Sequence, residues 1–233
     1  MRRWCVPLLA GAVVAGCSNA PARIGDPAPQ VSDSRAEASY RKIFEAATRR
    51  TQLYDALDAK VFAAATQQSP TFVAARAERL ASFQGLLPAD TQALVTKELA
   101  AAGKTYGFFL GVHTDARRQN DFDRPNSIWR LALATSAGEV TPISVDRVFR
   151  PNANVRGIYL YLADFWLGYR VVFPQRLPNG QPLVGPSDTE VTLKLDSAVG
   201  HGRLVFPALP PAPAVTPAPT ANPAPTANPT PSP

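Results

Sequence analysis

Two histidines, His113 and His201, are the side chains whose ordinary pKa would let them exchange protons near neutral pH. Serine-based hydrolysis also needs a nucleophile, commonly on the sharp turn of a Gly-x-Ser-x-Gly motif, and the sequence has no such motif. A zinc site needs three or four ligands, which two histidines without paired cysteines or spaced carboxylates do not supply. We therefore predict two surface histidines, no catalytic residue, no metal and no cofactor.

A cluster of aromatic side chains in the C-terminal half of the chain is a stronger candidate for binding. The cluster contains Tyr159, Tyr161, Phe165, Trp166 and Tyr169, with Arg170 directly after it. Aromatic rings beside arginine bind sugars or protein surfaces, so Tyr159, Tyr161, Trp166 and Arg170 form a candidate binding surface. The alternative is that Phe165 and Tyr169 belong to the core and the tyrosines cap a helical layer, because large aromatic side chains are mostly buried.

Residues 115–126 form the most polar loop of the chain and raise the question of calcium. Asn120, Asp121, Asp123 and Asn126 offer several oxygen ligands. Three interleaved arginines would compete as counter-ions, and the spacing does not match the twelve-residue calcium loop. Asparagine and aspartate are also ordinary turn residues. Asp121 and Asp123 also do not indicate a glycosidase, because two acids one residue apart point to opposite sides of an extended chain.

The most specific chemistry of the sequence is at Cys17. Arg2 and Arg3 precede the uncharged apolar stretch 6–16. As a helix this stretch would rise about 16 Å, short of a hydrocarbon core of about 30 Å, so it is typical of a signal peptide and not of a membrane span. It ends in an aliphatic residue, two small residues and cysteine, Val14-Ala15-Gly16-Cys17. This pattern resembles the lipobox of bacterial lipoproteins.

The lipobox resemblance implies a diacylglycerol thioether on Cys17, cleavage before this residue, and acylation of the new amino terminus. The membrane is then a partner through the Cys17 lipid anchor. Ser18 follows, and a residue other than aspartate there implies the outer membrane of a bacterial cell envelope in the sorting pattern that this resembles. The alternative is an ordinary secretory signal peptide that is cleaved after Ala20. Pro21 would then directly follow the cleavage site, and signal peptidases generally do not cleave before proline.

Composition and charge exclude several other classes of protein. The chain has 233 residues, 45% of them hydrophobic, which argues against a wholly disordered protein. Cys5 lies in the predicted signal peptide, so the mature chain would keep Cys17 alone and form no internal disulfide. Loss of Arg2 and Arg3 would lower the net charge from +6 to +4, spread over the chain. We therefore expect no nucleic-acid partner.

The pattern of residues divides the chain into five parts. We predict a signal peptide at 1–16, a flexible tether at 17–35, a helical segment at 36–103, a β-sandwich at 104–206 and a disordered tail at 207–233. The tail holds eleven of the 24 prolines and no charged side chain, as in a spacer, a ligand of a proline-binding partner, or a solubilising extension.

Within the helical segment, apolar residues at three- and four-residue steps predict a helix over 36–67. Ser69-Pro70 predicts the start of a second helix that ends near Gly85, and a third runs from Pro88 to Gly103. The tight junction at Gly103 predicts that the helices and the sandwich form one cooperative unit.

After Gly103 the apolar period becomes two, and six strands are predicted over residues 106–112, 129–134, 143–145, 167–173, 191–195 and 204–206. Gly200-His201-Gly202 predicts a hairpin turn, and residues 159–165 a short helical turn. The predicted fold is therefore α+β: an N-terminal helical segment of about three helices packed on an antiparallel, immunoglobulin-like β-sandwich of about six strands.

The β region has a characteristic order of segments: a Phe-rich strand, then Asn120-Asp121-Phe122-Asp123, then Asn126-Ser127-Ile128-Trp129-Arg130, then a strand with Tyr169-Arg170-Val171-Val172-Phe173-Pro174. This order resembles uncharacterised bacterial lipoproteins without a known activity. We predict a lipid-anchored, non-catalytic envelope lipoprotein that acts as a binding or assembly module, with an envelope protein or a glycan as partner. The alternative is an envelope hydrolase or carbohydrate-active enzyme with an unrecognised site.

Overall fold

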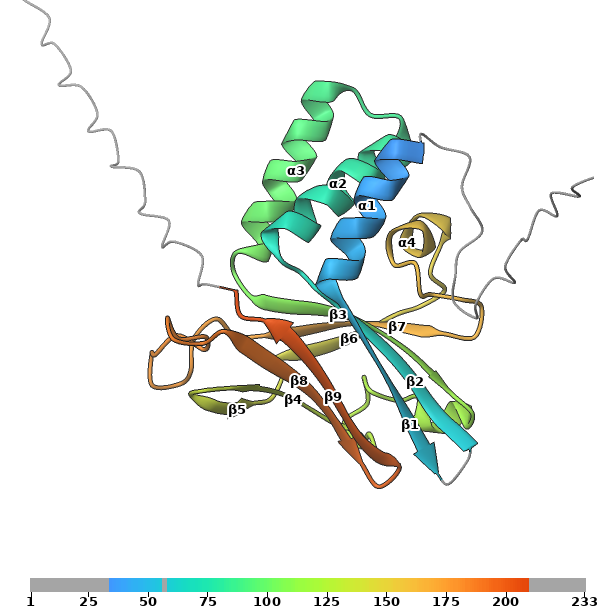
Figure 1. Ribbon diagram of the computed structural model, residues 1–233, viewed down its shortest axis with the longest axis vertical. Coiled ribbons are helices and arrows are strands. Elements are labelled where there is room, and N and C mark those ends of the chain that lie inside the picture. Colours follow the sequence, from blue (N-terminus) through green and yellow to red (C-terminus); the bar gives the residue numbers. More distant parts are fainter. Residues whose placement is uncertain (1–33, 56–57, 210–233) are drawn as a thin grey trace, which may run out of the picture.

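The computed structural model describes residues 34–55 and 58–209 (Figure 1). The predicted signal peptide, Cys17, nearly all of the tether and residues 210–233 of the tail lie outside the described residues. The elements in chain order are α1 (Ser34–Ala47), β1 (Thr48–Asp55), β2 (Asp58–Gln67), α2 (Pro70–Gln84), α3 (Pro88–Ala102), β3 (Tyr106–Thr114), a 3-10 turn (Arg117–Gln119), β4 (Arg130–Thr135), β5 (Gly138–Val140), β6 (Ser144–Val148), α4 (Ala153–Ile158), β7 (Leu167–Phe173), β8 (Glu190–Ser197) and β9 (Gly200–Pro207).

Two antiparallel sheets and four α-helices make up the described residues. One sheet has the order β1-β2-β3-β7-β6 and the other the order β5-β4-β8-β9. The predicted α+β class is confirmed, and each of the six predicted strands is present. The helices are not all N-terminal, because α4 lies between β6 and β7. In Figure 1 the helices lie on the side of the five-stranded sheet that faces away from the four-stranded sheet.

A single hydrophobic cluster fills the space between the two sheets. β3 contributes every second side chain to it: Tyr106, Phe108, Leu110 and Val112. The four-stranded sheet contributes Leu131, Leu133, Val191, Leu193, Leu195, Leu204 and Phe206. The ring of Phe108 lies 5.0 Å from that of Phe206 and 6.0 Å from that of Phe173, so aromatic side chains of both sheets meet at the centre. This alternation is the period of two that the sequence displays.

The predicted helix over 36–67 is wrong beyond Ala47, where the chain turns into the hairpin of β1 and β2. The alanines of 59–65 favour a helix by local propensity. In the structure β2 lies between β1 and β3, with Val61, Ala63 and Ala65 facing the other sheet and Ala64 facing the helices. Small side chains suit a strand that is covered on both faces, and that covering is a tertiary effect.

The predicted ends of α2 and α3 are confirmed. Ser69 caps α2 by accepting a hydrogen bond from the Phe72 amide at 3.2 Å, and Gly85 ends it with a left-handed φ of 63°. Pro88 begins α3 and Gly103 follows its last residue. None of the helices in the described residues is both long and apolar enough to cross a membrane.

The predicted turn at Gly200-His201-Gly202 is displaced by two residues. β8 ends at Ser197 and β9 begins at Gly200, so Ala198 and Val199 form the turn. Glycine has another use in β9, because a Cβ at position 202 would lie 3.2 Å from Cγ2 of Thr51 in β1. The missing side chain therefore lets the edges of the two sheets approach closely.

Candidate functional site

A second hydrophobic cluster covers the helix-facing side of the five-stranded sheet, and it is dominated by rings. Its buried members are Tyr40, Phe44, Ala47, Ala64, Phe72, Phe109 and residues 158–162. Phe109 of β3 stacks on Tyr159 with the ring centroids 3.6 Å apart and the planes at 7°. The ring of Tyr159, directly after α4, thus lies flat on a ring of the sheet.

Two glycines of the sheet make room for these rings. A Cβ at position 111 would lie 2.5 Å from Cε2 of Tyr161, and a Cβ at position 168 would lie 2.7 Å from Cζ of Phe109. Side-chain atoms do not approach this closely, so neither position has space for a larger residue. Gly111 and Gly168 are paired across β3 and β7 and therefore form one shallow depression in the sheet.

Arg79 of α2 ties the helices around this cluster together. Its Nη1 donates to Glu37 of α1 at 2.6 Å, and its Nε donates to the carbonyl of Gly157 in α4 at 2.8 Å. Its guanidinium also lies 4.1 Å from the ring centroid of Tyr40, whose hydroxyl donates to the carbonyl of Ile158 at 2.8 Å. One buried cation therefore fixes α1, α2 and α4 relative to one another.

The charge of Arg79 also sets the ionisation of Glu37. Burial raises the pKa of the Glu37 carboxyl, but hydrogen bonds and positive charges from Arg79 and Arg41 outweigh this effect. The pKa of Glu37 consequently lies below its usual value, and the carboxylate is ionised at neutral pH.

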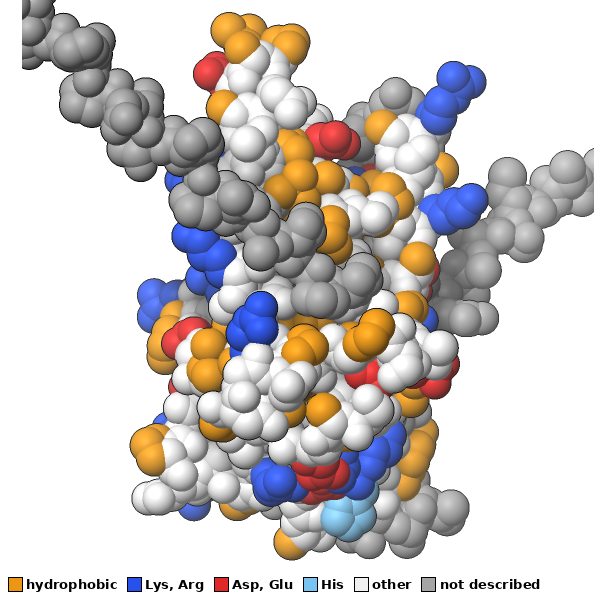
Figure 2. All heavy atoms as spheres, turned by 90° about the vertical axis from the view of Figure 1, so that its left-hand side faces the viewer, with side chains coloured by type: hydrophobic (Ala, Val, Ile, Leu, Met, Phe, Trp, Pro, Cys, Tyr) orange, Lys and Arg blue, Asp and Glu red, His pale blue; other side chains and the backbone are white. Residues whose placement is uncertain are grey.

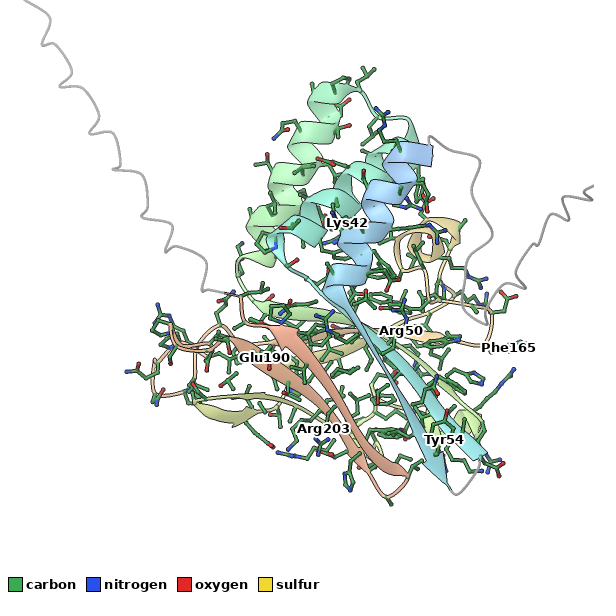
Figure 3. All side chains as sticks on the ribbon, viewed as in Figure 1. Lys42, Arg50, Tyr54, Phe165, Glu190 and Arg203 are labelled. Atoms are coloured by element: carbon green, nitrogen blue, oxygen red, sulfur yellow. The ribbon has the colours of Figure 1, made fainter. Side chains whose placement is uncertain are left out.

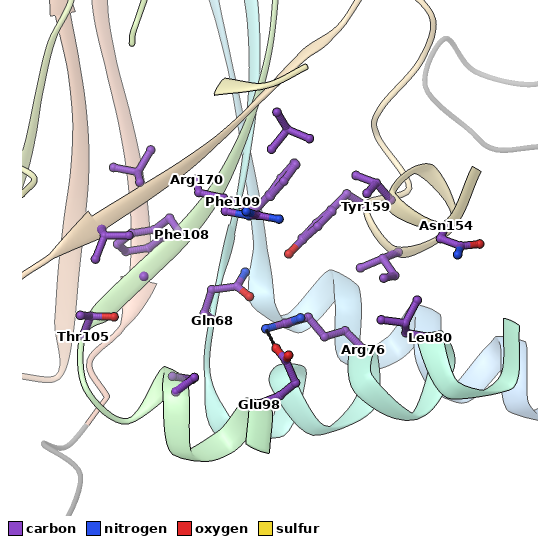
Figure 4. Close-up of a pocket in the computed structure, with 18 of the residues that line it drawn as sticks. Gln68, Arg76, Leu80, Glu98, Thr105, Phe108, Phe109, Asn154, Tyr159 and Arg170 are labelled. Atoms are coloured by element: carbon purple, nitrogen blue, oxygen red, sulfur yellow. Dashed lines mark hydrogen bonds and ion pairs between the residues drawn. The ribbon is translucent and has the colours of Figure 1, made fainter. Parts of the chain in front are cut away.

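Beside the aromatic cluster the helices leave a cavity of about 630 Å³ (Figure 4). It lies between α2, α3 and α4 and the helix-facing side of β3, β6 and β7. Its apolar walls include Leu80, Ala101, Ala102, Phe109, Val148, Val155 and Ile158, and its polar groups are Gln68, Arg76, Gln84, Glu98, Thr105, Asn152, Asn154, Tyr159 and Arg170. The volume lies within the range of about 300–1,000 Å³ that is typical of small-molecule sites.

Four polar side chains converge in this cavity from separate elements. Figure 4 shows Gln68, Arg76, Tyr159 and Arg170 directed toward a common space. Arg76 donates from Nη2 to Glu98 of α3 at 2.8 Å, whereas its Nε is buried and has no hydrogen-bond partner among the described residues. The side chain of Arg170 forms no hydrogen bond or ion pair within the described part of the chain. Both guanidinium groups therefore keep donors that the described residues do not use.

The hydroxyl of Tyr159 is held as a neutral group in this environment. Burial raises its pKa, and the charge of Arg76, a hydrogen bond with Gln68 and the charge of Arg170 oppose the rise without cancelling it. A neutral phenol both donates and accepts hydrogen bonds, so Tyr159 adds a polar tip to an otherwise apolar wall.

The structure separates the four residues of the candidate binding surface. Tyr159 and Arg170 line the cavity. Tyr161 is buried in the aromatic cluster and donates to the carbonyl of Phe109 at 2.8 Å, and Trp166 packs against the same cluster at its edge.

The alternative prediction, that Phe165 and Tyr169 belong to the core, is correct for Tyr169 and wrong for Phe165. Tyr169 is fully buried between the sheets, whereas the side chain of Phe165 is 68% exposed and lies at the outer edge of the molecule (Figure 3). Phe165 lies in the turn between α4 and β7.

The sequence analysis missed the cavity residues of the helices, above all Gln68, Arg76 and Glu98. Arg76, Leu80 and Gln84 do recur at steps of four, which places them on one face of α2. That pattern is equally typical of a solvent-exposed helix face, and only the position of α3 and β3 turns it into a wall.

Loop 115–126 uses its oxygens within the fold. Asp123 pairs with Arg147 at 2.6 Å, and Asp121 accepts from the hydroxyl of Ser127 at 2.9 Å. The Asn120 amide donates to the carbonyl of Val112 and accepts from the hydroxyl of Tyr169. Among the described residues, no group of three or more His, Cys, Asp or Glu side chains could hold a metal ion.

The two histidines lie at separate places outside the cavity. Nδ1 of His113 is 3.4 Å from the carbonyl oxygen of Phe165, and Nδ1 of the exposed His201 is 2.9 Å from Asp196. Arg203 pairs with the same carboxylate at 2.6 Å. Figure 2 shows a histidine beside acidic and basic side chains at the lower end of the molecule. Burial raises the pKa of Asp196, but the hydrogen bonds from Arg203 and His201 outweigh it and hold the pKa below its usual range.

Comparison with known proteins shows no established relative. No protein-family model matches the sequence, and no curated protein matches it. A crystal structure of a protein of unknown function from Burkholderia pseudomallei aligns with 72% of this chain and 83% of that chain, at 8% sequence identity and a TM-score of 0.36. A similarity at this level carries no argument about fold or function.

Proposed function

We propose that this protein is a lipid-anchored, non-catalytic lipoprotein of the bacterial cell envelope whose folded domain binds a ligand or partner. The anchor is the lipid on Cys17, and the outer membrane is the proposed location. The observation that supports a binding role is the cavity between α2, α3, α4 and the five-stranded sheet, in which unused donors from separate elements converge.

The chemistry of the cavity favours binding over catalysis. The ionisable groups among its described lining residues are Arg76, Glu98, Tyr159 and Arg170. Glu98 is engaged by Arg76, and burial raises the pKa of Tyr159. General acid–base catalysis uses groups that gain and lose protons near the working pH. Guanidinium, amide and neutral phenol groups instead hold a ligand in place.

We also propose that the two sheets form an immunoglobulin-like sandwich with the helices packed on one face. Three observations support this arrangement. The paired strands of the described residues are antiparallel, and the side chains between the sheets form one cluster. Rings of α1 and α2 also belong to the same buried cluster as Ala64 and Phe109 on the opposite face of the five-stranded sheet.

The anchor is tested by Cys17→Ser, with Cys5→Ser as the matched control because Cys5 lies in the predicted signal peptide. The wild-type protein and Cys5→Ser should partition into detergent and co-fractionate with outer membranes. Cys17→Ser should move to the aqueous phase and accumulate as an uncleaved precursor, because multiple acyl chains make such an anchor stable. Detergent partitioning of Cys17→Ser like the wild type would refute the anchor.

The binding role is tested at the cavity wall with Ala101→Trp, which adds a large side chain to the lining, and with Ala100→Trp, at a neighbouring position of the same helix outside the lining. Native mass spectrometry of the protein released gently from membranes should detect a bound ligand in the wild type and in Ala100→Trp. The bound mass should be lost from Ala101→Trp. An equal mass on all three proteins, or none on any, would contradict ligand binding in this cavity.

A further inference from the structure

We infer that the cavity takes a small amphipathic oxyanion, with its negative head between Arg76 and Arg170 and its apolar body against Phe109 and the helices. This inference rests on the proposed binding function and specifies the chemical class of the ligand.

The first support is the balance of charge inside the cavity. Arg76 and Arg170 contribute two positive charges and Glu98 one negative charge, which leaves a net charge of +1 among the described lining residues. Asp146 lies opposite Arg170 across β6 and β7, but its carboxylate accepts a hydrogen bond from Ser144 and forms no ion pair with Arg170 within the described residues. An anionic head would compensate the remaining positive charge.

The second support is the hydrogen-bonding capacity of Arg76. Among the described residues, this guanidinium is hydrogen-bonded to Glu98, and its buried Nε has no acceptor there. Buried polar groups in proteins nearly always have a partner, because an unpaired donor away from water is unfavourable. The described protein residues offer Arg76 one carboxylate, that of Glu98. An oxyanion beside Arg76 would supply acceptors for the remaining N–H groups of the guanidinium.

The third support is the apolar wall that faces these charges. The Phe109 and Tyr159 rings stack on one another, and Leu80, Val155 and Ile158 continue the wall. The hydroxyl of Tyr159 and the amide of Gln68 lie near the arginines and add donors for the head group. A fully polar anion would leave the apolar wall exposed to water, whereas a ligand with an apolar body would cover it.

The experiment uses the fluorescent anion 8-anilinonaphthalene-1-sulfonate as a probe and measures its displacement from the folded protein. Octanoate and octyl phosphate are the charged competitors, which stand for fatty acids and for phosphate-bearing lipids. Octan-1-ol is the neutral competitor of the same chain length. We expect one probe per protein, displaced by one or both anions at concentrations at least about tenfold lower than by the alcohol, which corresponds to about 1.4 kcal/mol.

Variants test the charges separately. Arg170→Gln should weaken probe and anion binding about five- to tenfold, because it removes a cation that the described protein residues do not pair. Glu98→Gln should strengthen binding, because it removes the negative charge of the cavity. Arg176→Gln is the control, since Arg176 donates to the carbonyl of Gly180 outside the cavity and should leave binding unchanged.

The outcomes separate this inference from the proposed function. Equal displacement by octan-1-ol and the anions, or binding that Arg170→Gln and Glu98→Gln leave unchanged, would overturn the oxyanion while leaving ligand binding intact. A natural ligand detected by mass spectrometry that carries no acidic group would overturn it as well. Failure of the probe and of every competitor to bind, together with no bound mass in the native protein, would overturn both.

Discussion

The two faces of the five-stranded sheet are packed in different ways. The inner face meets the four-stranded sheet through interleaved Leu, Val and Phe side chains. The outer face meets the helices through stacked rings, a buried arginine that joins three helices, and a cavity. Both faces are carried by the same strand, β3, whose neighbours Phe108 and Phe109 point in opposite directions.

The difference shows where a fold of this kind can accommodate function. Two sheets bring regular rows of side chains together and fill the space between them. Helices cross a sheet less regularly, so their contacts depend on individual rings, glycines and polar anchors. The outer face therefore contributes to stability and still retains space for a ligand.

The largest effect on stability is expected when the N-terminal part of the chain is removed, because its hairpin contributes to both faces of the five-stranded sheet. A fragment of residues 104–206 lacks α1, β1, β2, α2 and α3. The hairpin of β1 and β2 alone supplies Leu53, Val61 and Ala63 to the inner cluster and Ala64 to the outer one. It should not unfold cooperatively in urea and should lack a native near-ultraviolet circular dichroism signal. A fragment of residues 34–209 is the control. A sharp transition in the shorter fragment would show that residues 104–206 fold without the N-terminal part.

The second prediction compares adjacent residues of β3. Phe108→Ala should lower the free energy of unfolding by about 3–5 kcal/mol, because it leaves a cavity among packed rings. Phe109→Ala should cost less, about 2–3 kcal/mol, because one side of its ring already borders a cavity. Urea denaturation measures both values. Equal costs would mean that the two faces are equally well packed.

The third prediction uses two glycines on the outer face of β3. Gly111→Ala should destabilise the protein by about 1–3 kcal/mol, because its Cβ would overlap the Tyr161 ring. At Gly107→Ala the new Cβ would lie 3.4 Å from Cγ of Gln68, so the expected change in stability is below about 1 kcal/mol. Thermal denaturation of the two variants checks this. Similar melting temperatures would show that the ring of Tyr161 moves away easily.

The fourth prediction concerns pH and the outer face alone. The pKa of Glu37 is lowered in the folded protein, so its contribution is fully present above its unfolded pKa of about 4.3 and is lost as the pH falls through the lower folded pKa. Glu37→Gln should cost about 1–2 kcal/mol at pH 7 and much less near pH 3. Glu78→Gln is the control, because Glu78 lies in α2 next to Arg79 but does not belong to this ion pair. Urea curves at both pH values decide the matter; a loss that does not depend on pH would contradict the ion pair.

The smallest expected effect is at the end of the inner face. The tail was predicted to begin at Pro207, but Pro207 accepts from Gln67 at 2.9 Å, Ala208 donates to Thr189 at 2.9 Å, and Leu209 packs against the inner cluster. A chain that ends at Phe206 should be less stable than one that ends at Leu209 by about 1 kcal/mol, the loss of these contacts. Equal melting temperatures would mean that residues 207–209 add nothing.

Local sequence patterns were sufficient for the elements whose signals lie within a few residues. The caps at Ser69 and Gly85, the start at Pro88 and the alternating strands of 106–112 and 167–173 are confirmed, because a cap or a pleat depends on near neighbours. The lipobox at Cys17 is equally local, and it remains a prediction.

Tertiary structure decided what local patterns leave ambiguous. The alanine-rich residues 59–65 have the composition of a helix, and they form a strand because β1, β3 and the covering helices pair with and bury them. The same holds for the site. Tyr159 and Arg170 were candidates by composition, but Arg76, Glu98 and Gln68 join them across three other segments of the chain. A cavity is defined by the distances between elements, and those distances follow from how rings and glycines pack between the layers.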